Sequence, residues 1–169
     1  MKNEMFAKPA VGAIIEKDIN SVKHILIQKR RKGSSEDGLI EIPAGKIRKF
    51  ENIFDALKRE VKEETGLTIT NVTGENCQSV KIKSYSTISF SPFCITQNLL
   101  GGYSLIVFTF ICTCKGELYE KSDESSDIQW MEVNKVKSLL KMNPEKFFPM
   151  HVNSLKKYFE ESDKNNLNK

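Results

Sequence analysis

The fold of this chain is decided by residues 45–67, which read GKIRKFENIFDALKREVKEETGL. In the second half of this segment, apolar residues recur at intervals of three and four, which is typical of one face of an α-helix. These residues are Phe54, Leu57 and Val61. Asn52 can act as the N-cap, and Gly66 stands where a helix favours a left-handed residue. The segment therefore predicts a helix over Ile53–Thr65.

Three glutamates share one side of this predicted helix. Glu60, Glu63 and Glu64 are three and four positions apart, so their carboxylates fall within an arc of roughly 100° beside the apolar stripe. Like charges at this spacing repel each other, and burial strengthens the repulsion. A hard divalent cation such as Mg²⁺ or Mn²⁺ would offset it. The alternative is a solvated Lys/Glu face, and the three glutamates alone favour that alternative.

The spacing of charged residues and glycines over the whole segment 45–67 favours the metal site over the solvated face. Gly45 is followed by five residues and Glu51, then by seven residues and Arg59-Glu60-Val61, one residue, Glu63-Glu64, one residue and Gly66-Leu67. This pattern resembles the signature of the Nudix hydrolases, G-x5-E-x7-R-E-U-x-E-E-x-G-U with U aliphatic, and every specified position is filled. The resemblance implies an α/β protein, an α/β/α sandwich with a mixed β-sheet. It also implies metal-dependent attack of water on a pyrophosphate bond.

The resemblance assigns roles to residues in and around the segment. The implied metal ligands are the backbone carbonyl of Ala44 and the carboxylates of Glu60, Glu63 and Glu64. Glu51 and Arg59 would form an ion pair that braces the loop against the helix. Gly45 would allow a tight loop, and Gly66 would end the helix. The implied cofactor is Mg²⁺ or Mn²⁺.

The residue that takes the proton from the attacking water has more than one candidate. A helix carboxylate, Glu63 or Glu64, is one expectation. The other is an acid of the segment Ser122–Asp127, and there we favour Glu124 over Asp123. The second expectation competes with a plain solvated acidic loop.

The substrate is expected to be a small nucleotide. Arg30, within the basic run Lys29–Lys32, is the candidate for binding its phosphates, because a guanidinium can bind them in a bidentate manner. Pro43-Ala44-Gly45 resembles the ADP-ribose and nucleotide-sugar hydrolases of the family, so a nucleoside diphosphate linked to another group is the first expectation. The alternatives are a pyrophosphatase that removes damaged (d)NTPs and a catalytically silent nucleotide-sensing module.

The rest of the chain has the pattern of strands and closing helices expected of one domain covering residues 1–169. Strands are predicted at Ala10–Ile15, Ile25–Ile27, Leu67–Val72, Ser79–Lys83, Tyr85–Phe90, Leu105–Cys114 and Ile128–Val133, with a brief piece in Glu41–Gly45. Helices are predicted at Asn134–Met142 and Pro149–Phe159. We expect residues 6–159 to be ordered and the polar residues 160–169 to form a frayed tail.

Composition limits the other function classes. The 169 residues carry 26 Lys and Arg against 22 Asp and Glu, a net charge of +4, which is too small for a dedicated nucleic-acid binder. The start of the chain shows no secretory signal, and the longest apolar run is too short to span a membrane, so a cytoplasmic protein without membrane contact is expected. The four cysteines form no zinc-binding pattern. Many relatives form homodimers, but no apolar stripe marks an interface here.

Overall fold

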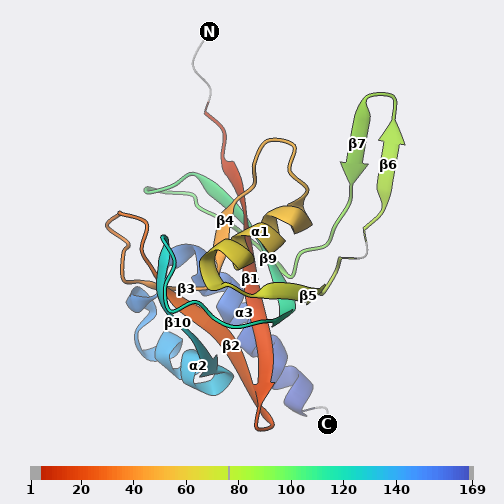
Figure 1. The fold of residues 1–169 in the computed structure, drawn as a ribbon. Coiled ribbons are helices and arrows are strands. Elements are labelled where there is room, and N and C mark those ends of the chain that lie inside the picture. Colours follow the sequence, from red (N-terminus) through yellow and green to blue (C-terminus); the bar gives the residue numbers. More distant parts are fainter. Residues whose placement is uncertain (1–4, 76, 168–169) are drawn as a thin grey trace.

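Strand β1 (Lys8–Ile19) lies in the middle of a large mixed sheet (Figure 1). The computed structural model describes residues 5–75 and 77–167, and these form eight strands of this sheet along the path β10-β2-β1-β9-β5, with three short strands paired to that path. β1 runs parallel to β9 and antiparallel to β2. The other strands of the sheet are β2 (Val22–Arg30), β3 (Ile40–Glu41), β4 (Ala44–Lys46), β5 (Thr68–Val72), β8 (Cys94–Gln97), β9 (Leu105–Lys115) and β10 (Ser125–Glu132).

β1 pairs with different antiparallel strands along its length. Its last residues, Glu16 to Ile19, pair with β2, whereas Ala10, Val11 and Gly12 pair with β4. The chain that connects β2 to β4 therefore lies at the end of the sheet where β1 begins. It includes the charged loop 31–38. This connection brings the ends of β2 and β4 together beside the first helix.

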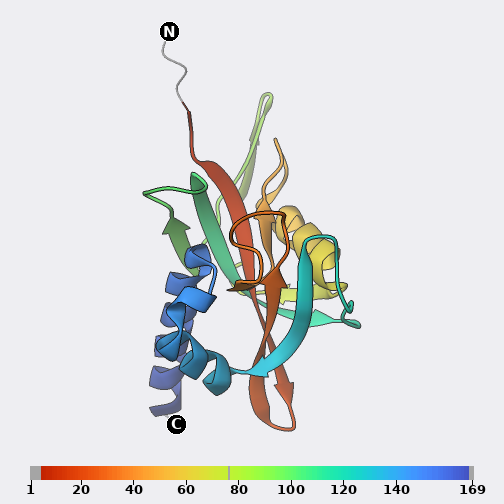
Figure 2. The same cartoon turned by 90° about the vertical axis from the view of Figure 1, so that its left-hand side faces the viewer.

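Helices cover both faces of the sheet, as the sandwich prediction requires. α1 (Ile53–Thr65) lies on one face, and α2 (Val133–Met142) and α3 (Pro149–Leu167) lie on the other, with the short 3₁₀ helix η1 (Pro144–Lys146) between them in the chain (Figure 2). One apolar core packs α1 against the sheet through residues such as Phe54 and Phe110. The second core packs α2 and α3 against the opposite face. The α/β/α sandwich with a mixed sheet is confirmed.

α1 has the bounds that its sequence predicts. The Asn52 side chain accepts a hydrogen bond from the backbone N–H of Phe54 at 2.9 Å, which satisfies one of the free donors of the first turn. At the other end, Gly66 adopts a left-handed conformation with φ of 82°, and its N–H donates to the carbonyl of Lys62. These caps fix the helix that carries the three glutamates.

The closing helix is longer than predicted. We expected it to end at Phe159, but α3 continues to Leu167, and residues 168–169 lie outside the described part of the chain. The extra turns are polar, yet Asp163 pairs with Lys137 of α2, and the Ser162 hydroxyl donates to the Tyr158 carbonyl. Contacts to a neighbouring helix therefore support a segment whose own sequence has no apolar pattern.

The strands also differ from prediction in detail. β8 was not predicted, and the expected piece over Glu41–Gly45 is divided into β3 and β4. β6 (Ser79–Ile82) and β7 (Tyr85–Ile88) occur as predicted but form a separate two-stranded hairpin that projects from the domain (Figure 1). Among the described residues, no helix is long and apolar enough to cross a membrane.

Candidate active site

Gly45, in β4, and Glu60, in α1, lie where the strand packs closely against the helix. A Cβ atom at Gly45 would lie only 2.0 Å from the carboxyl carbon of Glu60, so no side chain fits there while that carboxylate keeps its place. Gly45 is predicted to allow a tight loop. In the structure its backbone φ is not left-handed, and what requires glycine is this close approach of Glu60.

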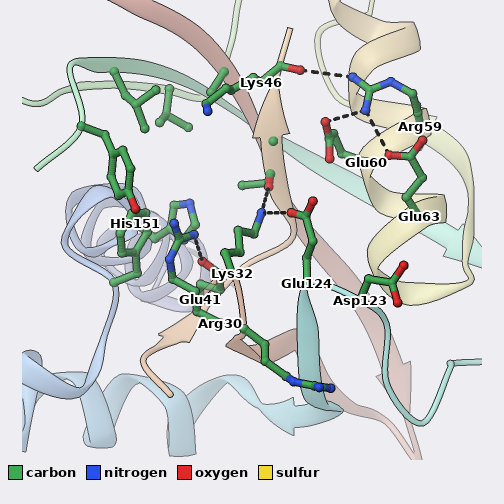
Figure 3. Close-up of a pocket in the computed structure, with 18 of the residues that line it drawn as sticks. Arg30, Lys32, Glu41, Lys46, Arg59, Glu60, Glu63, Asp123, Glu124 and His151 are labelled. Atoms are coloured by element: carbon green, nitrogen blue, oxygen red, sulfur yellow. Dashed lines mark hydrogen bonds and ion pairs between the residues drawn. The ribbon is translucent and has the colours of Figure 1, made fainter. Parts of the chain in front are cut away.

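Arg59 holds the outer carboxylates of the site. Its guanidinium donates to both oxygens of Glu51, at 2.7 Å from Nε and 2.9 Å from Nη2, which is the bidentate geometry of a strong ion pair. Nη1 also donates to Glu60 at 2.5 Å and to Glu63 at 3.2 Å (Figure 3). The guanidinium lowers the pKa of the Glu51 carboxyl to about 2. Arg59 thus links the loop before α1 to two of the three helix glutamates.

Glu64 is buried, unlike the adjacent Glu63. Its side chain is 3% exposed, whereas that of Glu63 is 52% exposed. Oε2 accepts hydrogen bonds from Gln28 Nε2 at 2.7 Å and from the backbone N–H of Ala44 at 3.0 Å. Burial raises the pKa of the Glu64 carboxyl, although Lys32 and these donors oppose the shift. Both hydrogen bonds tie the carboxylate to strands of the sheet.

The Lys32 ammonium faces three oxygen atoms at once. Nζ lies 2.7 Å from Glu64 Oε1. It also lies 2.8 Å from Glu124 Oε2 and 3.1 Å from the backbone oxygen of Ala44, two contacts that Figure 3 shows. Burial opposes the charge on this ammonium, but the facing carboxylates outweigh it and hold the pKa of Lys32 above its ordinary value. Lys32 therefore joins Glu124, from the loop before β10, to α1 and β4.

Arg30 is held in place by the protein. Nη1 donates to the buried Glu41 carboxylate at 3.2 Å, and the guanidinium carbon lies 4.4 Å from the ring centre of Phe148 and 5.7 Å from that of Tyr103. Burial, together with the nearby Glu64 charge, raises the pKa of Glu41 to about 7. That Arg30 binds substrate phosphates remains a prediction, and in the structure its guanidinium lies over the Phe148 ring.

These groups surround one cavity of about 690 Å³. Its lining is strongly charged and includes Arg30, Arg31, Lys32, Lys46, Arg48, Arg59, Glu41, Glu60, Glu63, Asp123 and Glu124. Glu64 lies behind Lys32, and Gly66 caps the far end of α1 beside Glu117 and Tyr119. A volume of this size suits a nucleotide-sized ligand, and the mixed charges suit an anion bound together with a cation.

Three residues of the site were not singled out from the sequence. Gln28, Glu41 and His151 are all about 1% exposed and carry polar groups into the region of the cavity. Gln28 lies two residues before Arg30 on β2, so the two side chains share one face of the strand. That spacing is the signal that could have identified Gln28. His151 Nδ1 accepts from the Ile42 N–H, and burial lowers the pKa of its ring to about 3. The His151 imidazole is therefore neutral.

The oxygen atoms fit a hard divalent cation. Within residues 5–75 and 77–167, no group of three His, Cys, Asp or Glu side chains is close enough to hold a metal ion. The carboxylates instead face two protein cations. Glu64 and Glu124 face Lys32, and Glu60 and Glu63 face Arg59. The donors themselves are carboxylate and carbonyl oxygens, which Mg²⁺ and Mn²⁺ prefer. The predicted metal-ligand roles remain predictions.

A model of the NUDIX domain matches residues 7–150, which is most of the chain. The chain belongs to the Nudix family. The family match and the complete carboxylate signature mark this Nudix protein as a hydrolase of pyrophosphate bonds. Among curated proteins, none matches the chain.

Solved Nudix structures share the fold. A MutT protein from Methanosarcina mazei Go1 is 19% identical, with a TM-score of 0.64, 94% of this chain covered and 97% of that one. The NUDIX domain of Shewanella oneidensis NrtR, solved in complex with ADP ribose, is 13% identical, with a TM-score of 0.65 and coverages of 95% and 91%. A C. elegans Ap4A hydrolase is 14% identical, with a TM-score of 0.52 and coverages of 90% and 96%. At these identities the likeness shows the Nudix fold alone.

Proposed function

We propose that this Nudix hydrolase cleaves the pyrophosphate bond of a nucleoside diphosphate linked to a second group, in a reaction that requires Mg²⁺ or Mn²⁺. The observation that carries the proposal is the convergence of the Glu64 carboxylate, the Glu124 carboxylate and the Ala44 carbonyl on one cation position, at 2.7 to 3.1 Å from Lys32 Nζ. Basic side chains line the same cavity, where an anionic diphosphate would bind.

The ion would be held by oxygen atoms that the fold already brings to the cavity. These are the Ala44 carbonyl and the carboxylates of Glu60, Glu63, Glu64 and Glu124. When bound, such an ion neutralises phosphate charge and makes a water molecule easier to deprotonate. Gly45 admits the Glu60 carboxylate, and Arg59 holds it next to the loop.

Among the candidate bases, the contacts favour Glu124 over Glu64. Glu64 is buried and both of its oxygens accept hydrogen bonds, so it can orient a ligand but is not free to turn toward a water. The Glu124 side chain is 56% exposed and lies in the loop before β10, so it can turn from the ion toward a water in the cavity. Glu63 is the remaining alternative, since it is also half exposed, although Arg59 holds it.

The substrate proposal rests on the cavity and on two related structures. The aromatic rings of Tyr103 and Phe148 border the cavity beside Arg30, so a base or sugar could pack there while the diphosphate meets the charged lining. The NrtR domain was solved with ADP ribose, and another neighbour is an Ap4A hydrolase. Both ligand types join a nucleotide to a second group through phosphates.

A substrate panel tests the proposal. The protein is incubated with ADP-ribose, nucleotide sugars, dinucleotides and (d)NTPs, with Mg²⁺ or with EDTA, and the products are identified by mass spectrometry. The proposal predicts that a nucleoside diphosphate linked to a second group releases a nucleoside monophosphate with Mg²⁺ and is not cleaved with EDTA. A clear preference for (d)NTPs would instead support the pyrophosphatase that removes damaged nucleotides. Tight binding of one nucleotide without any cleavage would support a sensing module, and cleavage in EDTA would contradict the metal requirement.

A further inference from the structure

Lys32 occupies the point at which the inner oxygens of the site converge. Glu64 belongs to α1, Ala44 to β4 and Glu124 to the loop before β10, so three separate segments direct an oxygen at one ammonium nitrogen. Figure 3 shows the contacts from Ala44 and Glu124. We propose that Lys32 is a resident cation that holds this position until a divalent ion replaces it. The inference rests on the proposed function and adds the residue with which the metal competes.

The contacts of Lys32 leave no room for a second cation at the same point. An ammonium has three N–H donors, and the three oxygens at 2.7, 2.8 and 3.1 Å can use all of them. A Mg²⁺ ion would need lone pairs of the same oxygens at a shorter distance, about 2.0–2.1 Å. The ammonium must therefore leave before these three oxygens can bind a divalent ion.

Lys32 can leave, whereas Arg59 is fixed. The Arg59 guanidinium is anchored by both oxygens of Glu51, so it stays beside the outer carboxylates. The Lys32 ammonium stands on a flexible four-carbon side chain. Its backbone is held independently, because its N–H donates to Asp37 Oδ1 at 2.8 Å. Only the side chain has to move, and the cavity beside it can receive the ammonium.

The resident cation has a clear physical purpose in the metal-free protein. Glu64 is 3% exposed, and a buried carboxylate without a counter-charge is costly. Lys32 supplies that charge, so Glu64 is compensated before any divalent ion binds. The same contact weakens metal binding. The ion can bind only the fraction of molecules in which Lys32 has left the site, and the smaller that fraction is, the weaker is the apparent affinity. Once released, the ammonium lies in the cavity that would bind the diphosphate.

Two charge-matched variants test the exchange. Lys32→Met removes the competing ammonium, and Lys46→Met removes the same charge from the same cavity without touching these oxygens. Binding of Mn²⁺ alone is measured by electron paramagnetic resonance or calorimetry, without nucleotide. We expect Lys32→Met to bind Mn²⁺ at least about ten-fold more tightly than wild type, and Lys46→Met to change the affinity by less than about three-fold. In EDTA, Lys32→Met should melt at a lower temperature than wild type, and Mn²⁺ should restore more of its stability.

The opposite results would overturn the inference. Weaker or unchanged Mn²⁺ binding by Lys32→Met would show that Lys32 supports the site or lies apart from it, while metal-dependent hydrolysis by wild type would still stand. Failure of both proteins to bind Mn²⁺ would overturn the metal requirement together with the exchange.

A measurement on the wild-type protein avoids any folding defect of the variant. An amine-acetylating reagent is applied briefly with and without Mg²⁺, and modification of Lys32 and Lys46 is quantified by mass spectrometry. Exchange predicts several-fold faster modification of Lys32 with Mg²⁺ and little change at Lys46. An unchanged or slower rate at Lys32 would contradict the exchange.

Discussion

The carboxylate of Glu60 rests against the backbone of Gly45, at a position where any Cβ atom would lie 2.0 Å from the carboxyl carbon. The contact joins α1 to β4, the strand that supplies the Ala44 carbonyl. It also places Glu60 where Arg59 can hold it. The packing of α1 against β4 and the proposed metal binding by Glu60 therefore both depend on the absence of a side chain at Gly45.

Gly45→Ala should weaken metal binding with little loss of stability. The new methyl group would push the Glu60 carboxylate away, and the end of a side chain can move more cheaply than backbone. We expect Mn²⁺ affinity to fall by about ten-fold, which corresponds to about 1.4 kcal/mol. Gly12→Ala is the control, because a Cβ there would make only ordinary contacts at 3.5 Å or more. An unchanged affinity for Gly45→Ala would mean that Glu60 is not a ligand.

Glu64→Gln should abolish most hydrolysis while the protein stays folded. The amide keeps the size of the side chain but loses the negative charge, so kcat should fall by at least about 1,000-fold if Glu64 holds the metal. Steady-state kinetics on the best substrate of the panel provides the measurement. Glu75→Gln is a matched control, since its carboxylate is an exposed partner of Lys58. Comparable activity of the two variants would rule out the role assigned to Glu64.

Glu51→Gln should destabilise the fold in a pH-dependent manner. It breaks the bidentate pair with Arg59, which we expect to cost about 1 kcal/mol at neutral pH. The pKa of Glu51 is lowered to about 2 in the folded protein. Its contribution is therefore present above its ordinary pKa and lost as the pH falls toward 2. Urea unfolding should show the gap between variant and wild type closing below pH 4, and a constant gap would contradict the pairing.

Glu41 should make the folded state less stable as the pH rises through neutrality. Burial raises its pKa to about 7, so the folded protein binds this proton more tightly than the unfolded chain does. The resulting stability is complete below the ordinary pKa of a glutamate and is lost as the pH rises through 7. Glu41→Gln resembles the protonated form, so its stability relative to wild type should increase between pH 5 and 8. Parallel urea-unfolding curves across that range would refute the shift.

The parts of the site predicted from the sequence are those that depend on local chain geometry. The caps of α1 and the arc of its three glutamates follow from spacing within one segment, and helical periodicity fixes these relations without reference to the rest of the fold. The pairing of Glu51 with Arg59 was expected from the family resemblance, and the structure contains it. The segment also sufficed to identify the family and the sandwich.

The inner contacts could not be predicted in the same way. Gln28 and Lys32 meet Glu64 only because β2 and the following loop pack against α1, and no spacing rule links positions so far apart. The Glu63 and Glu64 carboxylates are adjacent in sequence, yet one is half exposed and the other is buried. That difference comes from tertiary packing, which a helix pattern does not determine.

The parallel pairing of β1 with β9 has a consequence for the newly made chain. Lys8 pairs with Leu105 and Glu16 with Thr113, so the first strand of this domain waits for its neighbour until most of the domain has been synthesised. Until then Val11–Ile15, which pairs with β9 along its whole length, lacks that partner, and such edges invite pairing with other chains. Protection of the nascent protein by a chaperone would therefore matter most before β9 emerges.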